Sequence, residues 1–487
     1  MVVRFSGTVL LLVTVLLHGC SAFTSYRDRI EGPLQKFESG DFEGAYEGLE
    51  KRARKGTARL AYLLEAATVL HTEGDLKEST RIFSASEDLI RSYEERAVIS
   101  VTETAAKGAS LVLNEKTIPY EGEPFEKVLV HSYKALNYLF LGQTEEARVE
   151  IRRSFARQQE NRRRHEREIA ALEEEARDRQ IQIAGLLREA HAQYDESRIR
   201  SGPVLNPYED PFAYYLSALV YESNGEYNDA YIDLKRAQEL RPGVPCVEND
   251  LLRMAKLAGL KDAYREWSER LGRPARFSNP QAEGEILVFL QAGMGPRKEE
   301  VRLVLPVPEA GLVSVALPRY ARVQSRFDKA ALYDSDGRLL GETAVLTDIE
   351  TLAIRNLEDR MPVLVLKQVL RAAAKGVLAA TAADQGGAGA ALAVNLFNLV
   401  TEQADLRCWT TLPRNFQVAR IPLSGGSRRL TFAFLDGSGR RLVEQSLEAD
   451  MAPGSRVYLN VRTGSRSVVA FHVYGGGVRV EGGRTPP

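Results

Sequence analysis

Apolar residues follow two different spacings along the chain. From about residue 27 to residue 271 they recur every three or four positions, which places them on one face of an α-helix. From about Phe277 the spacing shortens to two, and short apolar runs such as residues 286–290 and 301–305 are typical of β-strands. The pattern therefore predicts an α+β fold class, with a helical N-terminal half followed by a β-rich C-terminal half.

The β-rich half is predicted to span residues 276–474 and to be sandwich-like. Its further predicted strands are residues 312–317, 330–333, 417–422, 429–435, 456–461 and 468–474. A helical hairpin insert is expected at about residues 360–404, because Pro362 suits a first helical turn and Gly386 interrupts the helix. The apolar runs of this insert are too short to cross a membrane. The Gly- and Pro-rich tail, residues 475–487, is predicted to be flexible.

The helical half contains an internal repeat of 34 residues. Turn glycines stand 34 or 68 residues apart in two series, namely Gly40, Gly74 and Gly142, and then Gly225 and Gly259. The best copy, residues 214–242, combines small residues, aromatic residues and a final proline in an order that resembles the tetratricopeptide repeat. The resemblance implies an α-solenoid of helical hairpins over residues 20–275, whose inner surface presents the first helix of each hairpin.

Residues 157–196 interrupt this array with a densely charged segment. Its apolar stripe has helical spacing, so we predict a charged helical insert that protrudes as an arm or short coiled coil. The basic cluster Arg162, Arg163 and Arg164 is typical of a solvated helix face. A site for anionic lipid or glycan is the less favoured interpretation of this cluster.

The first twenty residues are typical of a secreted protein. One early positive charge precedes an apolar run at residues 9–17, the pattern of a signal peptide that spans residues 1–19. The sequence Leu-His-Gly-Cys that ends at Cys20 resembles a bacterial lipobox, which implies cleavage before Cys20 and its acylation with fatty acids such as palmitate. A plain secretory signal is the alternative. Ser21 does not resemble an inner-membrane retention signal, so the predicted location is the outer membrane, facing the periplasm.

Several longer motifs extend this resemblance over nearly the whole mature chain. They are residues 120–126 (YEGEPFE), 206–212 (NPYEDPF), 355–360 (RNLEDR) and 401–413 (TEQADLRCWTTLP). Together they resemble a poorly characterised family of bacterial envelope lipoproteins with tetratricopeptide repeats. The resemblance implies a role in the cell envelope and brings no established reaction or cofactor with it.

Charge and cysteine content narrow the range of functions. Lys and Arg total 65 against 66 Asp and Glu, so the chain lacks the basic excess of a protein that neutralises nucleic-acid phosphates. Three cysteines are too few for a disulfide-rich scaffold. In an oxidising compartment Cys246 and Cys408 could form one disulfide between the two halves, and free thiols are the alternative.

The sequence shows no convincing catalytic, metal-binding or cofactor-binding constellation. No two histidines have the spacing of a metal site, and residues 293–298 and 424–427 carry only incomplete phosphate-loop and serine-hydrolase motifs. The most unusual polar segment carries Glu402 and Asp405, which could perform acid–base chemistry if one were desolvated. An ion-paired segment that ties a helix end to the β-rich half is the favoured interpretation, so no enzyme is predicted.

The inner surface of the solenoid is the predicted partner site. Its side chains are mostly apolar or aromatic, which favours a bound peptide or helix. The predicted groove consists of His71, Ser132, Leu136, Phe140, Phe212, Tyr215, Leu219 and Glu222. Alternatively, part of this surface packs against residues 157–196 or against the β-rich half.

The leading hypothesis is a non-enzymatic, membrane-anchored scaffold that binds envelope proteins through the repeat groove. A carbohydrate- or peptidoglycan-acting enzyme that uses Glu402 and Asp405 is one alternative. A structural subunit of an envelope complex, with the C-terminal sandwich as its contact surface, is the other.

Overall fold

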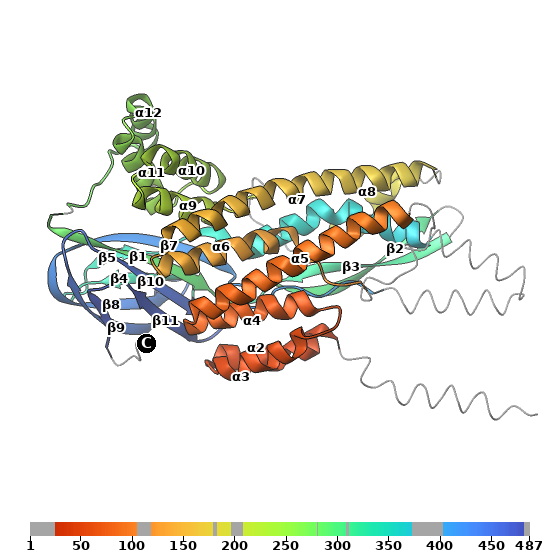
Figure 1. Cartoon of the computed structure of the whole chain (residues 1–487), viewed down its shortest axis with the longest axis horizontal. Coiled ribbons are helices and arrows are strands. Elements are labelled where there is room, and N and C mark those ends of the chain that lie inside the picture. Colours follow the sequence, from red (N-terminus) through yellow and green to blue (C-terminus); the bar gives the residue numbers. More distant parts are fainter. Residues whose placement is uncertain are drawn as a thin grey trace, which may run out of the picture.

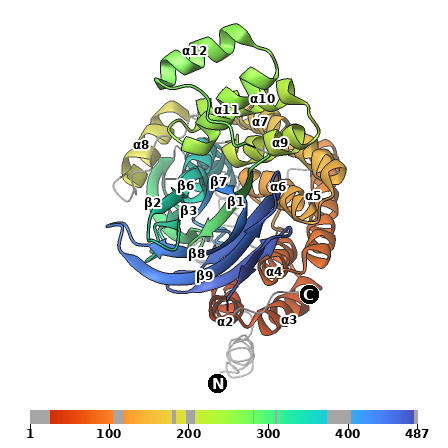
Figure 2. The same cartoon turned by 90° about the vertical axis from the view of Figure 1, so that its left-hand side faces the viewer.

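The computed structural model describes residues 25–104, 118–178, 183–195, 208–279, 281–307, 311–372 and 403–481. Its helices form a curved array, and its strands lie inside the curve (Figures 1 and 2). The structure therefore has the predicted α+β architecture, in which helical hairpins precede a strand-rich unit. No helix within the ranges given above is long and apolar enough to cross a bilayer.

The array consists of helical hairpins, as the 34-residue period predicts. The helices are α2 (Tyr26–Ser39), α3 (Phe42–Ala53), α4 (Arg59–Glu73), α5 (Leu76–Thr104), α6 (Pro124–Phe140), α7 (Thr144–Asp178), α8 (Ile183–Asp195), α9 (Pro211–Ser223), α10 (Tyr227–Leu240), α11 (Pro245–Leu257) and α12 (Lys261–Leu271). All five turn glycines of the repeat have a positive φ, between 72° and 103°. Residues with a Cβ rarely adopt this conformation, and this is why glycine marks the period.

The strands form two five-stranded sheets and one separate hairpin. Their bounds are β1 (Glu283–Ala292), β2 (Arg297–Val307), β3 (Gly311–Ala321), β4 (Lys329–Tyr333), β5 (Leu339–Glu342), β6 (Ala344–Asp348), β7 (Asn415–Ser424), β8 (Gly426–Leu435), β9 (Arg441–Met451), β10 (Arg456–Thr463), β11 (Val468–Tyr474) and β12 (Val478–Val480). The inner sheet has the order β11-β10-β1-β7-β6, the outer sheet has the order β12-β9-β8-β4-β5, and β2 pairs with β3. β1 and β10 run parallel, whereas β1 and β7 run antiparallel.

All eight strands expected from the sequence are present. Sequence analysis missed β5, β6, β9 and β12, because three of these have five residues or fewer and β9 is rich in charged residues. β12 also corrects the prediction of a flexible tail for its first part, since Val478–Val480 pairs with β9. Residues 482–487 of that tail lie outside the described ranges. A helix at residues 349–372 begins before the predicted insert boundary at 360, and residues 373–402 of that insert lie outside the described ranges.

The charged segment at 157–196 does not protrude from the described structure. α7 passes through its first part as one continuous helix, and Lys367 from the helix at 349–372 pairs with Glu168 on α7. α8 packs against the β2–β3 hairpin, where the Tyr194 hydroxyl donates to the carbonyl oxygen of Pro318 (3.1 Å). The prediction of a free arm is therefore wrong, because other parts of the chain cover the apolar stripe of this segment.

The inner sheet is buried on both faces. Along β1, Ile286, Val288 and Leu290 pack against the outer sheet, whereas Leu287 and Phe289 pack against the helices. This explains why β1 appears in the sequence as an uninterrupted apolar run. The helical array thus covers the second apolar face of a sandwich.

Candidate functional site

The predicted groove residues lie at the seam, which we define as the contact between helices α4, α6 and α9 and the inner sheet. The ring of Phe212 stacks on Phe416 with centroids 4.4 Å apart, and the ring of Phe140 stacks on Tyr474 at 4.6 Å. Seven of the eight predicted residues are buried, and the eighth, Glu222, forms ion pairs across the seam. These residues therefore lie on the inner surface of the array, as the sequence predicts. The inner sheet of the same chain covers this surface.

This occupancy corrects the prediction of a groove open to a partner. The inner sheet has a second apolar face, and packing it against the helices removes both surfaces from water. The alternative that the β-rich half packs on the inner surface is confirmed. In this structure the groove residues join the two halves of the chain.

His71 belongs to a buried hydrogen-bond network that spans the seam. Asn137 Nδ2 donates to the hydroxyl oxygens of Ser79 and Thr80 (both 3.1 Å), so Asn137 Oδ1 faces His71 Nδ1, which therefore carries the proton. His71 Nε2 then accepts a hydrogen bond from Gln291 Nε2 at 2.7 Å. Burial lowers the pKa of His71 to about 4, so the ring is neutral at pH 7 and acts as a structural link.

Residues 405–412 form an irregular segment that inserts between the helices. The Trp409 side chain is 1% exposed, and its indole N–H donates to Thr68 Oγ1 (2.8 Å). Its backbone N–H donates to Glu126 Oε1 (2.8 Å), and the next two backbone N–H groups donate to the two oxygens of Glu65 (2.6 and 2.7 Å). Two buried carboxylates thus receive three consecutive backbone N–H groups, so the array binds a segment of its own chain as a groove would bind a peptide.

The carboxylates around this segment differ in their affinity for protons. Burial and the charge of Glu123 raise the pKa of Glu126 to about 7. Burial acts to raise the pKa of Glu123 as well, but Arg360 and Lys298 outweigh it and lower this pKa to about 2. Burial also raises the pKa of Glu65. A pKa of about 7 means that Glu126 binds and releases a proton near neutral pH.

Asp405, one of the two carboxylates considered for acid–base chemistry, pairs with Arg407 through both of its oxygens (2.7 and 2.8 Å). Arg407 also donates to the carbonyl oxygens of Thr57 (2.8 Å) and Ile118 (3.0 Å), and so fixes the segment to the turn between α3 and α4. The contacts of Asp405 therefore agree with the interpretation favoured from the sequence, in which this segment is held by ion pairs. Glu402 lies outside the described residues.

Arg462 on β10 holds the same segment from the side of the sheet. Arg462 is 1% exposed, and its guanidinium donates to four carbonyl oxygens, those of Gln291, Gly293, Thr411 and Leu412. Burial lowers the pKa of Arg462 to about 10. Because carbonyl dipoles surround this charge, removing the segment would leave a desolvated cation without two of its four carbonyl partners, those of Thr411 and Leu412.

Ion pairs hold the other end of the seam. Arg420 on β7 pairs with Glu222 on α9 (2.8 Å), Asp250 on α11 (3.1 Å) and Glu285 on β1 (2.7 Å). Burial acts to raise the pKa of Glu222, but Arg420 and Arg253 outweigh it and lower this pKa to about 2. Carboxylates from both halves of the chain therefore converge on one buried guanidinium.

Cys246 and Cys408 are free and buried, so the disulfide considered from the sequence is not formed. Cys246 lies in α11 beside Tyr215 and Asp250, whereas Cys408 Sγ lies 3.9 Å from the carbonyl oxygen of Pro296. The two thiols thus belong to different ends of the seam. Burial raises the pKa of both thiols to about 12, which keeps them protonated. Cys20 lies outside the described residues.

Sequence analysis missed one cluster of potential metal ligands. Glu87, His131 and Glu150, on α5, α6 and α7, bring their ligand atoms within 4.8 Å of one another. The ammonium group of Lys134 lies between the carboxylates, 2.8 Å from Glu87 and 2.9 Å from Glu150. Lys134 takes the position that a metal cation would need, so the cluster is an ion-pair network that joins three helices. No sequence spacing signals it, because each ligand comes from a different helix.

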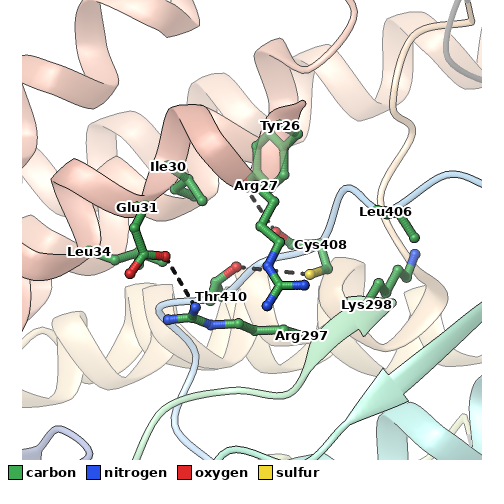
Figure 3. Close-up of a pocket in the computed structure, with 10 residues that line it drawn as sticks. All are labelled: Tyr26, Arg27, Ile30, Glu31, Leu34, Arg297, Lys298, Leu406, Cys408 and Thr410. Carbon is green, nitrogen blue, oxygen red and sulfur yellow. Dashed lines mark hydrogen bonds and ion pairs between the residues drawn. The ribbon is translucent and has the colours of Figure 1, made fainter. Parts of the chain in front are cut away.

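A small pocket opens beside the 405–412 segment, at the start of α2 (Figure 3). Its lining includes Arg27, Arg297, Glu31 and Cys408, and Arg297 pairs with Glu31 at 3.2 Å. The free space inside is comparable to one water molecule. The pocket is therefore too small for an organic substrate.

No protein-family model matches the chain, and no curated protein matches it. Among solved structures, the MamA protein is 13% identical and aligns over 49% of this chain and 85% of its own, with a TM-score of 0.27. A putative kinesin light chain of Podosopora anserina with tetratricopeptide-like repeats is 16% identical (50% and 92% covered, TM-score 0.27). A tetratricopeptide-repeat protein of Parabacteroides merdae is 14% identical (52% and 81% covered, TM-score 0.22). The tetratricopeptide-like character of the helical hairpins is seen in the 34-residue period and the positive φ of its turn glycines.

Proposed function

We propose that this protein is a non-enzymatic, lipid-anchored scaffold of the bacterial cell envelope. In this proposal acylated Cys20 attaches the chain to the outer membrane, and the folded part faces the periplasm. The apolar run at residues 9–17 and the lipobox-like sequence before Cys20 support the location. The repeated helical hairpins support a role in protein–protein interaction.

The filled seam is the observation that carries the proposal. Aromatic stacking, the Trp409 contacts and the Arg420 ion pairs join the helical array and the sandwich into one body. Such a body presents rigid outer surfaces, and partners would bind there and not inside the array. The groups with strongly shifted pKa values, such as Glu126 and Glu222, are enclosed by other parts of the same chain. Burial and neighbouring charges account for their shifts without catalysis.

The test is crosslinking in cells followed by affinity capture of the full-length chain, with Cys20→Ala as the comparison. Mass spectrometry of the mature N-terminus establishes in parallel whether Cys20 is acylated. We expect a reproducible set of envelope proteins that is captured with the acylated chain and is lost with the variant. An unmodified Cys20 would contradict the anchor, and capture that is no better than an unrelated envelope lipoprotein would contradict the scaffold.

The role of structural subunit remains a second candidate, because the outer sheet has an open face. Along residues 447–451 of β9, exposed residues alternate with buried ones; residues 441–446 are exposed or half-buried, and Val443 remains 37% exposed. Crosslinks from β9 to a fixed partner at constant stoichiometry would favour this role over a scaffold with exchangeable partners. Crosslinks confined to the outer helices would contradict it.

A further inference from the structure

We propose that one end of the helical array docks onto an anionic phospholipid surface. We define this basic end by six exposed side chains in the first turn of α2, at the end of α3 and at the start of α4: Arg27, Arg29, Arg52, Arg54, Lys55 and Arg59. The proposal names the lipid partner and the orientation of the chain. It rests on the proposed anchor at Cys20, although its electrostatic part can be measured separately.

The structure brings the basic end together from two separate stretches of sequence. The rings of Tyr26 in α2 and Tyr62 in α4 lie 5.3 Å apart, and the guanidinium of Arg29 lies beside the Tyr62 hydroxyl. The carbonyl oxygen of Thr57, in the intervening turn, accepts from the backbone N–H of Tyr120 (2.7 Å) and from Arg407 (2.8 Å). In Figure 1 the start of α2 and the turn between α3 and α4 lie at the same end of these helices. The cations are therefore held on one rigid surface.

The cations at this end outnumber the carboxylates beside them. Residues 51–59 contain five cationic side chains and no acidic one, although the whole chain has a net charge of −1. Lys51 pairs with Glu47 (3.2 Å), Arg54 pairs with Glu50 (3.0 Å), and Asp28 stands between Arg27 and Arg29 in the first turn of α2. Within the described ranges Lys55 and Arg59 form no ion pair with a carboxylate. A cluster of this size and sign attracts anionic lipid headgroups over a Debye length, about 8 Å at physiological salt.

The cluster that stands out in the sequence, Arg162 to Arg164, does not offer the same surface. Arg162 pairs with Glu209 (3.1 Å), and Arg164 pairs with Glu94 (3.0 Å) and Glu121 (3.1 Å). Two of its three charges are therefore compensated by the fold. This contrast makes α7 the natural control.

The position of Cys20 explains why a lipid surface is the partner we choose. Tyr26 is six positions after Cys20, and six residues reach about 20 Å at most. An acyl group on Cys20 would therefore keep the basic end close to the headgroups of the same leaflet. A basic patch beside the anchored residue adds electrostatic attraction to the anionic headgroups and so orients the chain on the leaflet.

The experiment places the full-length acylated chain in vesicles of phosphatidylcholine with or without phosphatidylglycerol. Thr57→Cys carries a fluorophore, since Thr57 is exposed and the native Cys246 and Cys408 are buried. Headgroup-spin-labelled lipid quenches the fluorophore when the basic end docks. A second label at Lys261→Cys, in the exposed first turn of α12, reports on the opposite part of the array (Figure 1).

We expect quenching at position 57 only with phosphatidylglycerol, and its loss in about 1 M salt, where the Debye length falls to about 3 Å. The triple variant Arg54→Gln, Lys55→Gln, Arg59→Gln should lower the ratio of docked to undocked chain about tenfold or more. The matched variant Arg152→Gln, Arg163→Gln, Arg167→Gln on α7 should leave this ratio unchanged.

Equal quenching with and without phosphatidylglycerol, or equal losses in both triple variants, would overturn the docking surface. If Cys20 proves to be unmodified, vesicle association that depends on phosphatidylglycerol and on residues 54, 55 and 59 would support the surface while the anchor fails. If Cys20 is acylated but the quenching at position 57 does not depend on phosphatidylglycerol, the anchor is supported and the docking surface is contradicted. The two proposals therefore fail in distinguishable ways.

Discussion

At one end of the seam, backbone N–H groups of the Trp409 segment donate to the buried carboxylates of Glu65 and Glu126. At the other end, Arg420 forms ion pairs with carboxylates from α9, α11 and β1. The first end depends on the shape of one loop and on the charge state of Glu126. The second end depends on ion pairs between full charges. Its stability changes little with pH near neutrality but falls strongly when one partner of the ion pairs is removed. One intramolecular interface can therefore use two chemistries with different sensitivities.

The strongest test of this comparison removes both ends of the seam at once, by deleting the β-rich half of the chain. A chain that stops at residue 275 keeps the helices but exposes Phe140, Phe212 and the other apolar residues of the seam to water. We expect this fragment to aggregate or to bind a hydrophobic dye strongly, as size-exclusion chromatography and dye fluorescence would show. A monodisperse, folded fragment would mean that the array is stable without the sandwich, and would reopen the inner groove as a partner site.

Trp409→Ala should have the next largest effect, because it removes a fully buried side chain and the hydrogen bond to Thr68. We expect the free energy of unfolding in urea to fall by about 3–5 kcal/mol. The other tryptophan, Trp267, is the matched control. It is buried in the terminal helix α12, away from the seam, so Trp267→Ala should affect α12 without separating the two halves. Equal global losses in both variants would contradict a special role for the Trp409 segment.

Arg420→Met tests the ion-paired end. The substitution leaves Glu222, Asp250 and Glu285 near one another without their shared cation, so we expect a loss of about 3 kcal/mol. Arg265→Met removes an exposed ion pair with Asp262 and should cost less than about 0.5 kcal/mol. Chemical denaturation measures both. Similar small losses would show that Arg420 does not hold this end of the seam.

The smallest expected effect is a pH dependence at the Trp409 end. The pKa of Glu126 is raised to about 7 in the folded chain from an ordinary value of 4.5, so the folded state binds the proton more tightly than the unfolded state. This contribution is fully present below pH 4.5 and is lost as the pH rises through 7. It should lower the free energy of unfolding by about 1.4 kcal/mol between pH 6 and pH 8.

Denaturation across this pH range, with Glu126→Gln as the comparison, isolates the effect. The variant should show a flatter profile than the wild type, because glutamine does not titrate. Stability that rises with pH in the wild type, or identical slopes in both proteins, would contradict a protonation centred on Glu126.

The local pattern of the sequence was sufficient for the helical hairpins and for most strands. Gly40 and Gly74 mark turns because their backbone conformation excludes most other residues, and this requirement is visible in one dimension. The run at 286–290 was recognised as a strand for a similar reason. Its double burial was not recognised, since a continuous apolar run does not state what covers each face.

The candidate site shows the same division. The residues on the inner surface of the array were predicted correctly, because helical periodicity assigns them to one face. Their partner was not, because Phe416 and Tyr474 are distant in the sequence and no local signal connects them to Phe212 and Phe140. The Glu87, His131 and Glu150 network was missed for this reason as well.

By itself, then, the sequence determined what is local in this protein: the repeat period, the turn glycines, the change from helix to strand and the lipobox-like segment. Only the tertiary structure decided which surfaces meet, which charges are compensated and which remain exposed. Residues 51–59 and 162–164 are both basic runs, yet the fold pairs most of the second and leaves most of the first to solvent. Compensation of charge depends on distances of a few ångströms between residues far apart in the chain, and only folding sets those distances.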